Sequence, residues 1–148
     1  MECNGDGVDH INIYSKGETE LGRFLSNFSG HKVITNDGEF ASIEGYWYWL
    51  NAQGSQREVL RKAAGWEAKK IGRELRAADW GKDNLFKMKI AHAMLSKLIL
   101  HPEIFKLFQE STLPFRHYYV YGGKINEPRE GRWIVNLWEY LRKMAKDN

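Results

Sequence analysis

The chain has 148 residues, a length that favours one domain and buries enough surface for a hydrophobic core. Hydrophobic residues make up 43% and charged residues 28%, as is typical of a soluble globular protein. The formal net charge of +3 is too small to argue for nucleic-acid binding by itself. No run of about 18 apolar residues occurs, so the sequence predicts no membrane-spanning helix and no membrane partner.

The first nine residues are polar and rich in glycine, and they predict a flexible tail (residues 1–9) before one domain over residues 10–148. The single cysteine, Cys3, excludes an intrachain disulfide and fits a reducing compartment. The same segment does not resemble a secretion signal. We therefore expect a cytoplasmic protein, and the sequence leaves its oligomeric state open.

Short strands and turns are expected in the first third of the chain. Residues 11–14 have the composition of a strand, and residues 23–30 are expected to form a loop with three apolar side chains. Residues 33–41 are typical of a β-hairpin, because Asn-Asp-Gly at residues 36–38 favours a tight turn.

Helices are expected in most of the remaining chain. Ser42 and Ser55 are typical N-caps, and Pro102 fits the first turn of a helix. Residues 118–121 have strand composition and end at two glycines. The expected helical segments are residues 42–53, 57–64, 66–78, 82–100, a segment from 102, and 132–146, the last with Ile134, Leu137, Trp138, Leu141 and Met144 facing inward. These elements predict an α+β fold, mostly helical with a small antiparallel sheet.

Several common chemistries are absent from the sequence. It contains neither a dinucleotide-binding glycine motif nor a phosphate-binding Walker loop. One cysteine and five scattered histidines give no zinc-ligand spacing, and no serine nucleophile elbow is present. We therefore expect neither a metal nor a cofactor.

One acid, Glu44, stands in an unusual place. It lies in the first turn of a predicted helix and is followed by four aromatic residues, of which Tyr48 shares its face and Trp47 lies beside it. The structural interpretation is an acid that favours the helix dipole. The functional interpretation is a carboxyl walled by rings, whose raised pKa suits it to general acid or base catalysis.

The segment over residues 23–28 has two interpretations as well. Ser26 and Asn27 are typical of a buried turn in which side chains bond to the local backbone. Alternatively, Phe24 and Phe28 anchor a loop that presents Arg23, Ser26 and Asn27 to a ligand.

Together these segments occur in a characteristic order. Leu25-Ser26-Asn27-Phe28 precedes the predicted hairpin, and Ser42-Ile43-Glu44-Gly45-Tyr46-Trp47 follows it. Later matching positions are Glu67-Ala68-Lys69-Lys70-Ile71-Gly72-Arg73, Trp80, Lys87-Met88 and Leu141-Arg142. This combination resembles the NADAR (YbiA-like) family from about residue 11 to residue 142.

Two positions depart from the family pattern. The histidine that follows the family's glutamate is Gly45 here, and the family's acid near the last strand is replaced by Tyr118. If that acid takes part in catalysis, the alternatives in this chain are His117, Tyr118, or a downstream acid such as Glu127 or Glu130.

The resemblance implies binding of an ADP-ribose-like nucleotide and cleavage of an N-glycosidic bond. The implied substrates include ADP-ribosylated guanine in nucleic acid, a free nucleotide, and an intermediate of riboflavin synthesis. Such cleavage passes through an oxocarbenium-like state and needs a carboxylate. The implied catalytic residue is Glu44, and the implied binding residues are Arg23, Phe24, Ser26, Asn27, Tyr48, Trp80, His117, Tyr118 and Arg132.

Two other functions remain open from the sequence. A non-catalytic module that senses or sequesters ADP-ribose-like nucleotides is favoured by the missing acid at Tyr118. A structural protein that uses its tyrosine and tryptophan residues in an interface is the other alternative.

Overall fold

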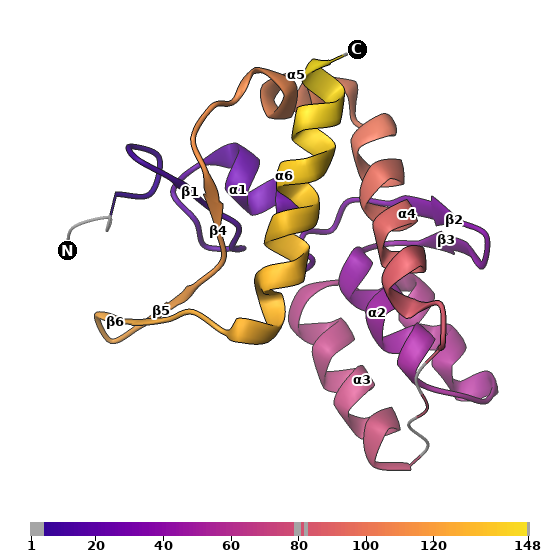
Figure 1. Cartoon of the computed structure of the whole chain (residues 1–148). Helices are drawn as coiled ribbons and strands as arrows, with labels where there is room; N and C mark the ends of the chain where they lie inside the picture. The colour runs from indigo at the N-terminus through magenta and orange to yellow at the C-terminus, as the bar shows by residue number, and fades with distance from the viewer. Residues whose placement is uncertain (1–4, 79–80, 82, 148) are drawn as a thin grey trace. The chain divides into compact units, whose positions relative to one another are not determined.

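The computed structural model describes residues 5–78, 81 and 83–147. Contacts divide the chain into two units. Figure 1 shows the ribbon coloured by residue number. Unit 1 comprises residues 1–26 and 102–148, and unit 2 comprises residues 27–101. Each unit is described by itself.

Unit 1 joins the two ends of the chain through a short parallel strand pair. Strand β1 (Ile11–Asn12) pairs with β4 (Phe115–Arg116), although we expected antiparallel pairing alone. The antiparallel hairpin consists of β5 (Tyr119–Tyr121) and β6 (Lys124–Asn126). The helices of this unit are α1 (Glu20–Leu25), α5 (Pro102–Glu110), the 3-10 turn η2 (Arg129–Gly131) and α6 (Arg132–Lys146).

Aromatic packing and a buried cation hold α6 in unit 1. Trp138 is fully buried and lies edge-on to Phe108, which stacks on Phe115. Arg142 is also buried and donates to the Leu113 carbonyl oxygen at 2.8 Å. The inward face of α6 therefore includes Arg142, whereas Met144, which we expected to face inward, is 45% exposed.

The N-terminal segment is more ordered than the sequence predicts from residue 5 onward. Asp6 is buried, and its carboxylate accepts hydrogen bonds from the backbone N–H groups of Asn12 (2.9 Å) and Glu18 (2.8 Å). The predicted tail therefore extends too far, because Asp6 satisfies backbone donors that would otherwise be buried without a partner.

Unit 2 contains a hairpin and the helices that pack on it. Strands β2 (Val33–Thr35) and β3 (Gly38–Phe40) are antiparallel, as the Asn-Asp-Gly turn predicts. Helix α2 (Ile43–Asn51) contacts both neighbouring helical segments, η1 (Ser55–Lys62) and α3 (Gly65–Ala78). Helix α4 (Phe86–Ile99) packs on β2 and α2.

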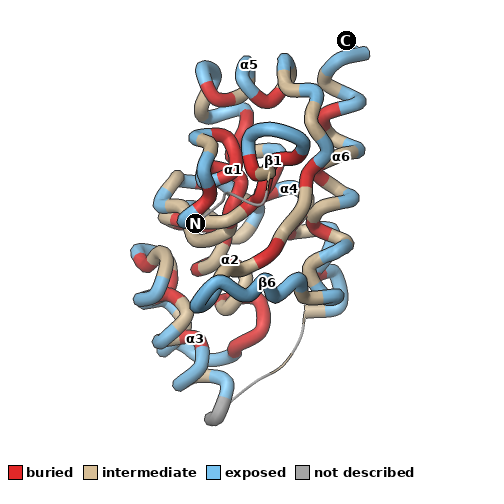
Figure 2. Tube along the Cα trace, turned by 90° about the vertical axis from the view of Figure 1, so that its left-hand side faces the viewer, coloured by how far each residue is buried: buried red, intermediate tan, exposed pale blue. Residues whose placement is uncertain are grey.

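Aromatic rings and guanidinium groups pack together in unit 2. Phe40, Tyr46 and Trp49 are buried and contact one another. Arg57 lies 3.5 Å from the centre of the Trp49 ring, and Arg61 lies 4.6 Å from the centre of the Phe40 ring. These contacts fix η1 against α2 and β3. Figure 2 shows which of the described residues are buried, intermediate or exposed.

The structure confirms the predicted fold class and corrects some elements. Residues 23–25 belong to helix α1 and not to a loop. The predicted helix over residues 57–64 is the 3-10 helix η1, and the two glycines that were expected to end a strand form the turn between β5 and β6. Within the described part of the chain, no helix has both the length and the apolar character needed to cross a membrane.

Candidate functional site

The start of helix α2 positions Glu44. Ser42 caps the helix: its hydroxyl accepts from the Gly45 backbone N–H at 3.0 Å and donates to the Ala63 carbonyl oxygen at 2.9 Å. The backbone N–H of Glu44 donates to the Asn27 carbonyl oxygen at 2.9 Å. These hydrogen bonds tie the first turn of α2 to Ala63 and Asn27. They thereby fix the backbone from which the Glu44 side chain extends.

The carboxyl of Glu44 is held in surroundings that oppose its ionisation. Burial raises its pKa to about 7, even though the nearby cations Lys69 and Arg73 lower it. The cost of removing the carboxylate from water therefore exceeds the attraction of two cations. At neutral pH the protonated and ionised forms are both populated, which is the condition a general acid or base requires.

Asn27 carries an acceptor without a partner near this turn. Its side-chain oxygen Oδ1 is buried, and no described residue donates to it. A buried acceptor in this state costs free energy, and such atoms in native proteins call for an explanation such as a ligand. Because the main chain of Asn27 is bonded to Glu44, the unused acceptor and the carboxyl belong to one local structure.

Tyr48 extends the site along α2. It lies one turn after Glu44, and its ring packs directly on Gly72 of α3, where any side chain would collide with it. Burial raises the pKa of Tyr48 and the charge of Glu44 raises it further, whereas Arg73 and Arg76 lower it. Glycine at residue 72 therefore allows α2 and α3 to approach, with Tyr48 between them.

Rings and a lysine lie at the start of α3. Phe28 and Trp66 meet edge-on with ring centres 5.7 Å apart. The ammonium group of Lys69 lies 5.0 Å from the centre of the Trp66 ring and 5.8 Å from that of Phe28. Trp66 is 62% exposed, so a flat group from solvent can stack on it.

Steric constraints explain why glycine follows Glu44. A Cβ atom at Gly45 would lie 2.5 Å from the Leu60 carbonyl oxygen and 3.0 Å from that of Ala63. The backbone of η1 thus occupies the space that a larger side chain would need. A histidine at this position does not fit the packing of this chain.

Unit 1 holds three of the other predicted binding residues on or beside helix α1. Arg23 is exposed and donates to the Gly17 carbonyl oxygen at 2.8 Å. Phe24 is 2% exposed and Ser26 is 8% exposed, so both belong to the interior. Phe24 therefore acts as an anchor, in line with one interpretation of this segment, and presents no face to a ligand.

Tyr118, predicted to stack on a ligand, is a core residue of unit 1. It is 1% exposed, and its hydroxyl forms a 2.6 Å hydrogen bond with Nε2 of His10. Its backbone is paired in both directions with the amide of Asn12. A ring enclosed in this way leaves no surface for stacking, so the prediction for Tyr118 is corrected.

The remaining predicted residues of unit 1 are more accessible. The ring of His117 is bonded through Nδ1 to the Ile13 carbonyl oxygen at 2.6 Å, and burial lowers its pKa. Glu127 forms an ion pair with Arg116 at 2.8 Å. Arg132 is exposed as the first residue of α6, and Glu130 is exposed in η2. Trp80 lies outside the described residues.

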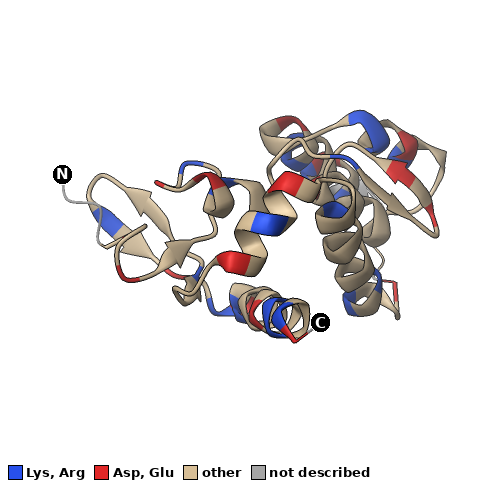
Figure 3. Ribbon diagram, turned by 90° about the horizontal axis from the view of Figure 1, so that it is seen from above, with Lys and Arg blue, Asp and Glu red and all other residues tan. Residues whose placement is uncertain are grey.

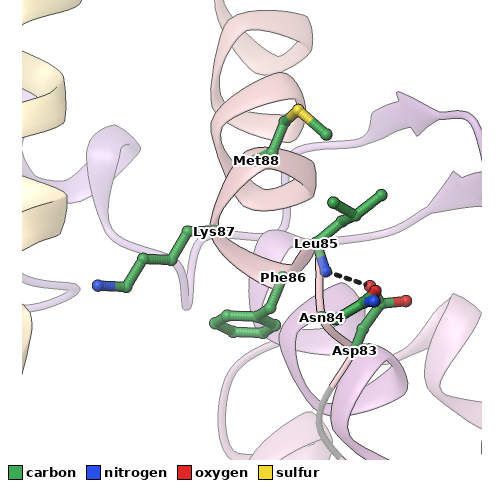
Figure 4. A pocket seen from close by; sticks show the side chains of 6 residues that line it. All are labelled: Asp83, Asn84, Leu85, Phe86, Lys87 and Met88. Carbon is green, nitrogen blue, oxygen red and sulfur yellow. Dashed lines mark hydrogen bonds between the residues drawn. The ribbon is translucent and has the colours of Figure 1, made fainter.

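Figure 4 shows an open hollow formed by consecutive residues at the beginning of α4. In the turn before this helix, Asp83 accepts from the Leu85 N–H at 2.8 Å, and the ring of Phe86 meets that of Trp47 edge-on. Because a single segment forms the hollow, it combines no groups from different elements. Among the described residues, no three His, Cys, Asp or Glu side chains gather as metal ligands.

The structure therefore adds Lys69 and Arg73 to the site that the sequence predicts. Both occur in the segment that carries the family resemblance, but their helical spacing alone does not show which face meets Glu44. The structure brings together Asn27, Glu44, Tyr48, Lys69 and Arg73 within unit 2.

A solved protein structure is similar to this chain over most of its length. No family model matches the sequence, and no curated protein matches it. The NMR structure of the E. coli protein YbiA matches the structure with a TM-score of 0.70 and 18% sequence identity, over 97% of this chain and 92% of YbiA. The chain has the YbiA fold. At this identity the likeness concerns the fold alone.

Proposed function

We propose that this protein is an N-glycosidase that hydrolyses the bond between ribose C1 and a base nitrogen in an ADP-ribosylated or otherwise ribosylated compound. The observation that carries the proposal is the Glu44 carboxyl, which burial holds at a pKa of about 7. The YbiA fold and the family resemblance of the surrounding motifs support it.

Glu44 supplies the acid–base chemistry in this proposal. Its carboxylate takes a proton from a water molecule while the water oxygen forms a bond to C1. The C1–N bond breaks, its electron pair passes to the base nitrogen, and that nitrogen takes up one proton from solvent, while Glu44 returns to solvent the proton that it took from water. The carboxylate also stabilises the positive charge that develops on the ribose ring.

The neighbouring residues bind the rest of the ligand in this proposal. Asn27 Oδ1 accepts a hydrogen bond from a ribose hydroxyl or a base N–H, which would satisfy the buried oxygen. Lys69 and Arg73 bind phosphate oxygens, because both are cations beside Glu44. Tyr48 forms a wall of the site on the face of α2 that carries Glu44.

A second candidate function is a non-catalytic binder of ADP-ribose-like nucleotides. The enclosure of Tyr118, which replaces the acid expected from the family pattern, favours it. The same cations and the Asn27 acceptor would hold the ligand.

One experiment tests the enzyme against the binder. The purified protein and Glu44→Gln are incubated separately with ADP-ribosylated guanosine, an ADP-ribosylated oligonucleotide, NAD and the riboflavin intermediate, and products are identified by mass spectrometry. Release of ADP-ribose or ribose phosphate by the wild type alone supports the enzyme. Tight binding of these compounds with no product released from any of them would support the non-catalytic binder in place of the enzyme.

A further inference from the structure

Helix α4 carries a row of apolar side chains that face solvent. Leu85, Met88, Leu95 and Ile99 are between 42% and 60% exposed, although each of them is large and apolar. Together with His92, which is also exposed, they are spaced three, four, three and four residues apart, so they lie along one face of the helix. This face of α4 is therefore left open to solvent by the rest of the described chain.

Strand β2 widens this apolar surface. Ile34 is 52% exposed, and its backbone N–H donates to the hydroxyl of Ser96 on α4 at 2.9 Å. Leu100, which lies one helical turn after Ser96, is 36% exposed. We call the six exposed apolar residues the α4 patch: Ile34, Leu85, Met88, Leu95, Ile99 and Leu100. A continuous apolar patch on a folded domain is often an interaction site.

The charged residues of α4 do not oppose contact between two copies of the patch. Lys97 is completely buried, and Lys87 points away from the labelled patch residues in Figure 4. Lys89 lies beside the patch and forms ion pairs with Asp83 at 2.8 Å and with Asp37 at 3.6 Å. Figure 3 shows Lys, Arg, Asp and Glu along the ribbon. Two patches can therefore meet without placing like charges of α4 opposite each other.

The two ends of the patch have complementary shapes. At the beginning of α4, the open hollow in Figure 4 is lined by residues 83–88, which include Leu85 and Met88. At the other end, Ile99 is the most exposed residue of the patch, at 60%. Leu85 and Ile99 are about 21 Å apart along the helix, at 1.5 Å per residue. A second copy packed antiparallel would therefore bring Ile99 of each copy to the hollow of the other, as a twofold axis requires.

The size of the patch suits a small dimer interface. Its six residues are between 36% and 60% exposed, which amounts to about three whole side chains. At about 100 Å² of apolar surface for each large side chain, the patch offers roughly 300 Å² on one copy. The smallest specific interfaces bury about 500 Å² on each partner, of which about 60% is apolar. The patch therefore supplies the apolar area of a weak dimer and not of a permanent one.

From spacing, shape and area we propose that this protein forms a weak homodimer through antiparallel packing of two α4 patches. The apolar row of each helix fills the spaces between side chains on the other, as in the seam of a coiled coil. This pairing places Met88 of one copy beside Ile99 of the other, and it places His92 near the twofold axis. The dimer uses none of the residues assigned to the glycosidase site, so the inference does not depend on the proposed function.

Sedimentation velocity of the full chain measures self-association over concentrations from about 1 to about 200 µM. We expect a Kd on the order of 10 µM, because interfaces of this size bind weakly. Leu95→Glu should raise that Kd about tenfold or more, since it places a carboxylate in an apolar seam. The matched control is Val59→Glu on η1, a 59% exposed apolar residue of unit 2, which should leave the Kd unchanged. Thermal unfolding shows whether both variants remain folded.

A complementary pair of variants tests the antiparallel arrangement. Met88→Glu and Ile99→Lys should each weaken self-association when they are studied alone. An equimolar mixture of the two should associate about as well as the wild type, because the carboxylate of one copy meets the ammonium group of the other. A mixture that associates no better than its separate components would overturn the antiparallel arrangement.

Two results would overturn the dimer itself. One is a wild-type protein that sediments as a monomer at every concentration. The other is equal weakening by Leu95→Glu and Val59→Glu, since an added charge at any exposed position would then have the same effect. Because sedimentation is measured without substrate, either result would leave the glycosidase proposal intact.

Discussion

Replacing Glu44 with glutamine should stabilise the protein, and the gain should grow with pH. The pKa of this carboxyl rises from 4.5 to about 7 on folding because burial disfavours the charged form. Between these values the folded chain binds more protons than the unfolded chain, so wild-type stability falls as pH rises from about 4.5 to about 7. Glutamine does not ionise, so the stability of Glu44→Gln does not fall with pH for this reason.

The size of the effect follows from the shift. One pKa unit corresponds to about 1.4 kcal/mol, so a shift from 4.5 to about 7 amounts to roughly 3 kcal/mol at pH 8. The shift already includes every interaction of the ionised carboxyl in the folded chain, so no separate correction for the helix dipole is needed. The expected gain of Glu44→Gln is therefore about 3 kcal/mol at pH 8 and close to zero at pH 4.5.

Urea unfolding at pH 4.5, 6, 7 and 8 measures this gain. The matched control is Glu67→Gln, an exposed first-turn acid of α3, for which we expect a change of less than about 0.5 kcal/mol at every pH. If Glu44→Gln changed the free energy of unfolding by the same amount at pH 4.5 and pH 8, the carboxyl would not be held in desolvating surroundings.

Three further predictions concern the neighbours of Glu44. Asn27→Ala should lower the free energy of unfolding in urea by less than about 1 kcal/mol, because the lost Oδ1 atom has no partner among the described residues. The same variant should raise the Kd for ADP-ribose at least tenfold in calorimetry. A large stability loss with unchanged affinity would contradict the binding role. Lys69→Ala and Arg73→Ala should each shift the pH dependence of turnover to higher pH, since both cations lower the pKa of Glu44; an unshifted pH profile would argue against that coupling. Gly45→Ala should destabilise the fold by about 2 kcal/mol or more, because its Cβ would lie 2.5 Å from a carbonyl oxygen. If the variant had the melting temperature of the wild type, η1 would be able to move aside.

Local sequence signals predicted much of unit 2. The Asn-Asp-Gly turn specified the hairpin, and Ser42 specified the start of α2, because both act on the backbone within a few residues. Helix α1 was missed although Thr19 caps it by accepting from Gly22 at 2.9 Å. It has only six residues and a glycine in its interior, so neither length nor propensity indicates a helix.

Features that depend on distant contacts could not be predicted. Tyr118 is enclosed because the amide of Asn12, 106 residues away in sequence, pairs with its backbone. The role of Lys69 and Arg73 depends on which face of α3 meets α2, and Gly72 decides that by admitting the ring of Tyr48. From the sequence we expected a raised pKa for Glu44, and burial does raise it, but that burial depends on packing that the sequence does not show.

The central claim is that Glu44 acts as the base in cleavage of a ribose C1–N bond. The most direct measurement is kcat/KM of the wild type for ADP-ribosylated guanosine from pH 5 to pH 9, beside Glu44→Gln. The claim predicts a rate that rises through about pH 7 to a plateau, following ionisation of the carboxyl, and a loss of at least 100-fold in the variant. Turnover by Glu44→Gln within a few-fold of the wild type would contradict it.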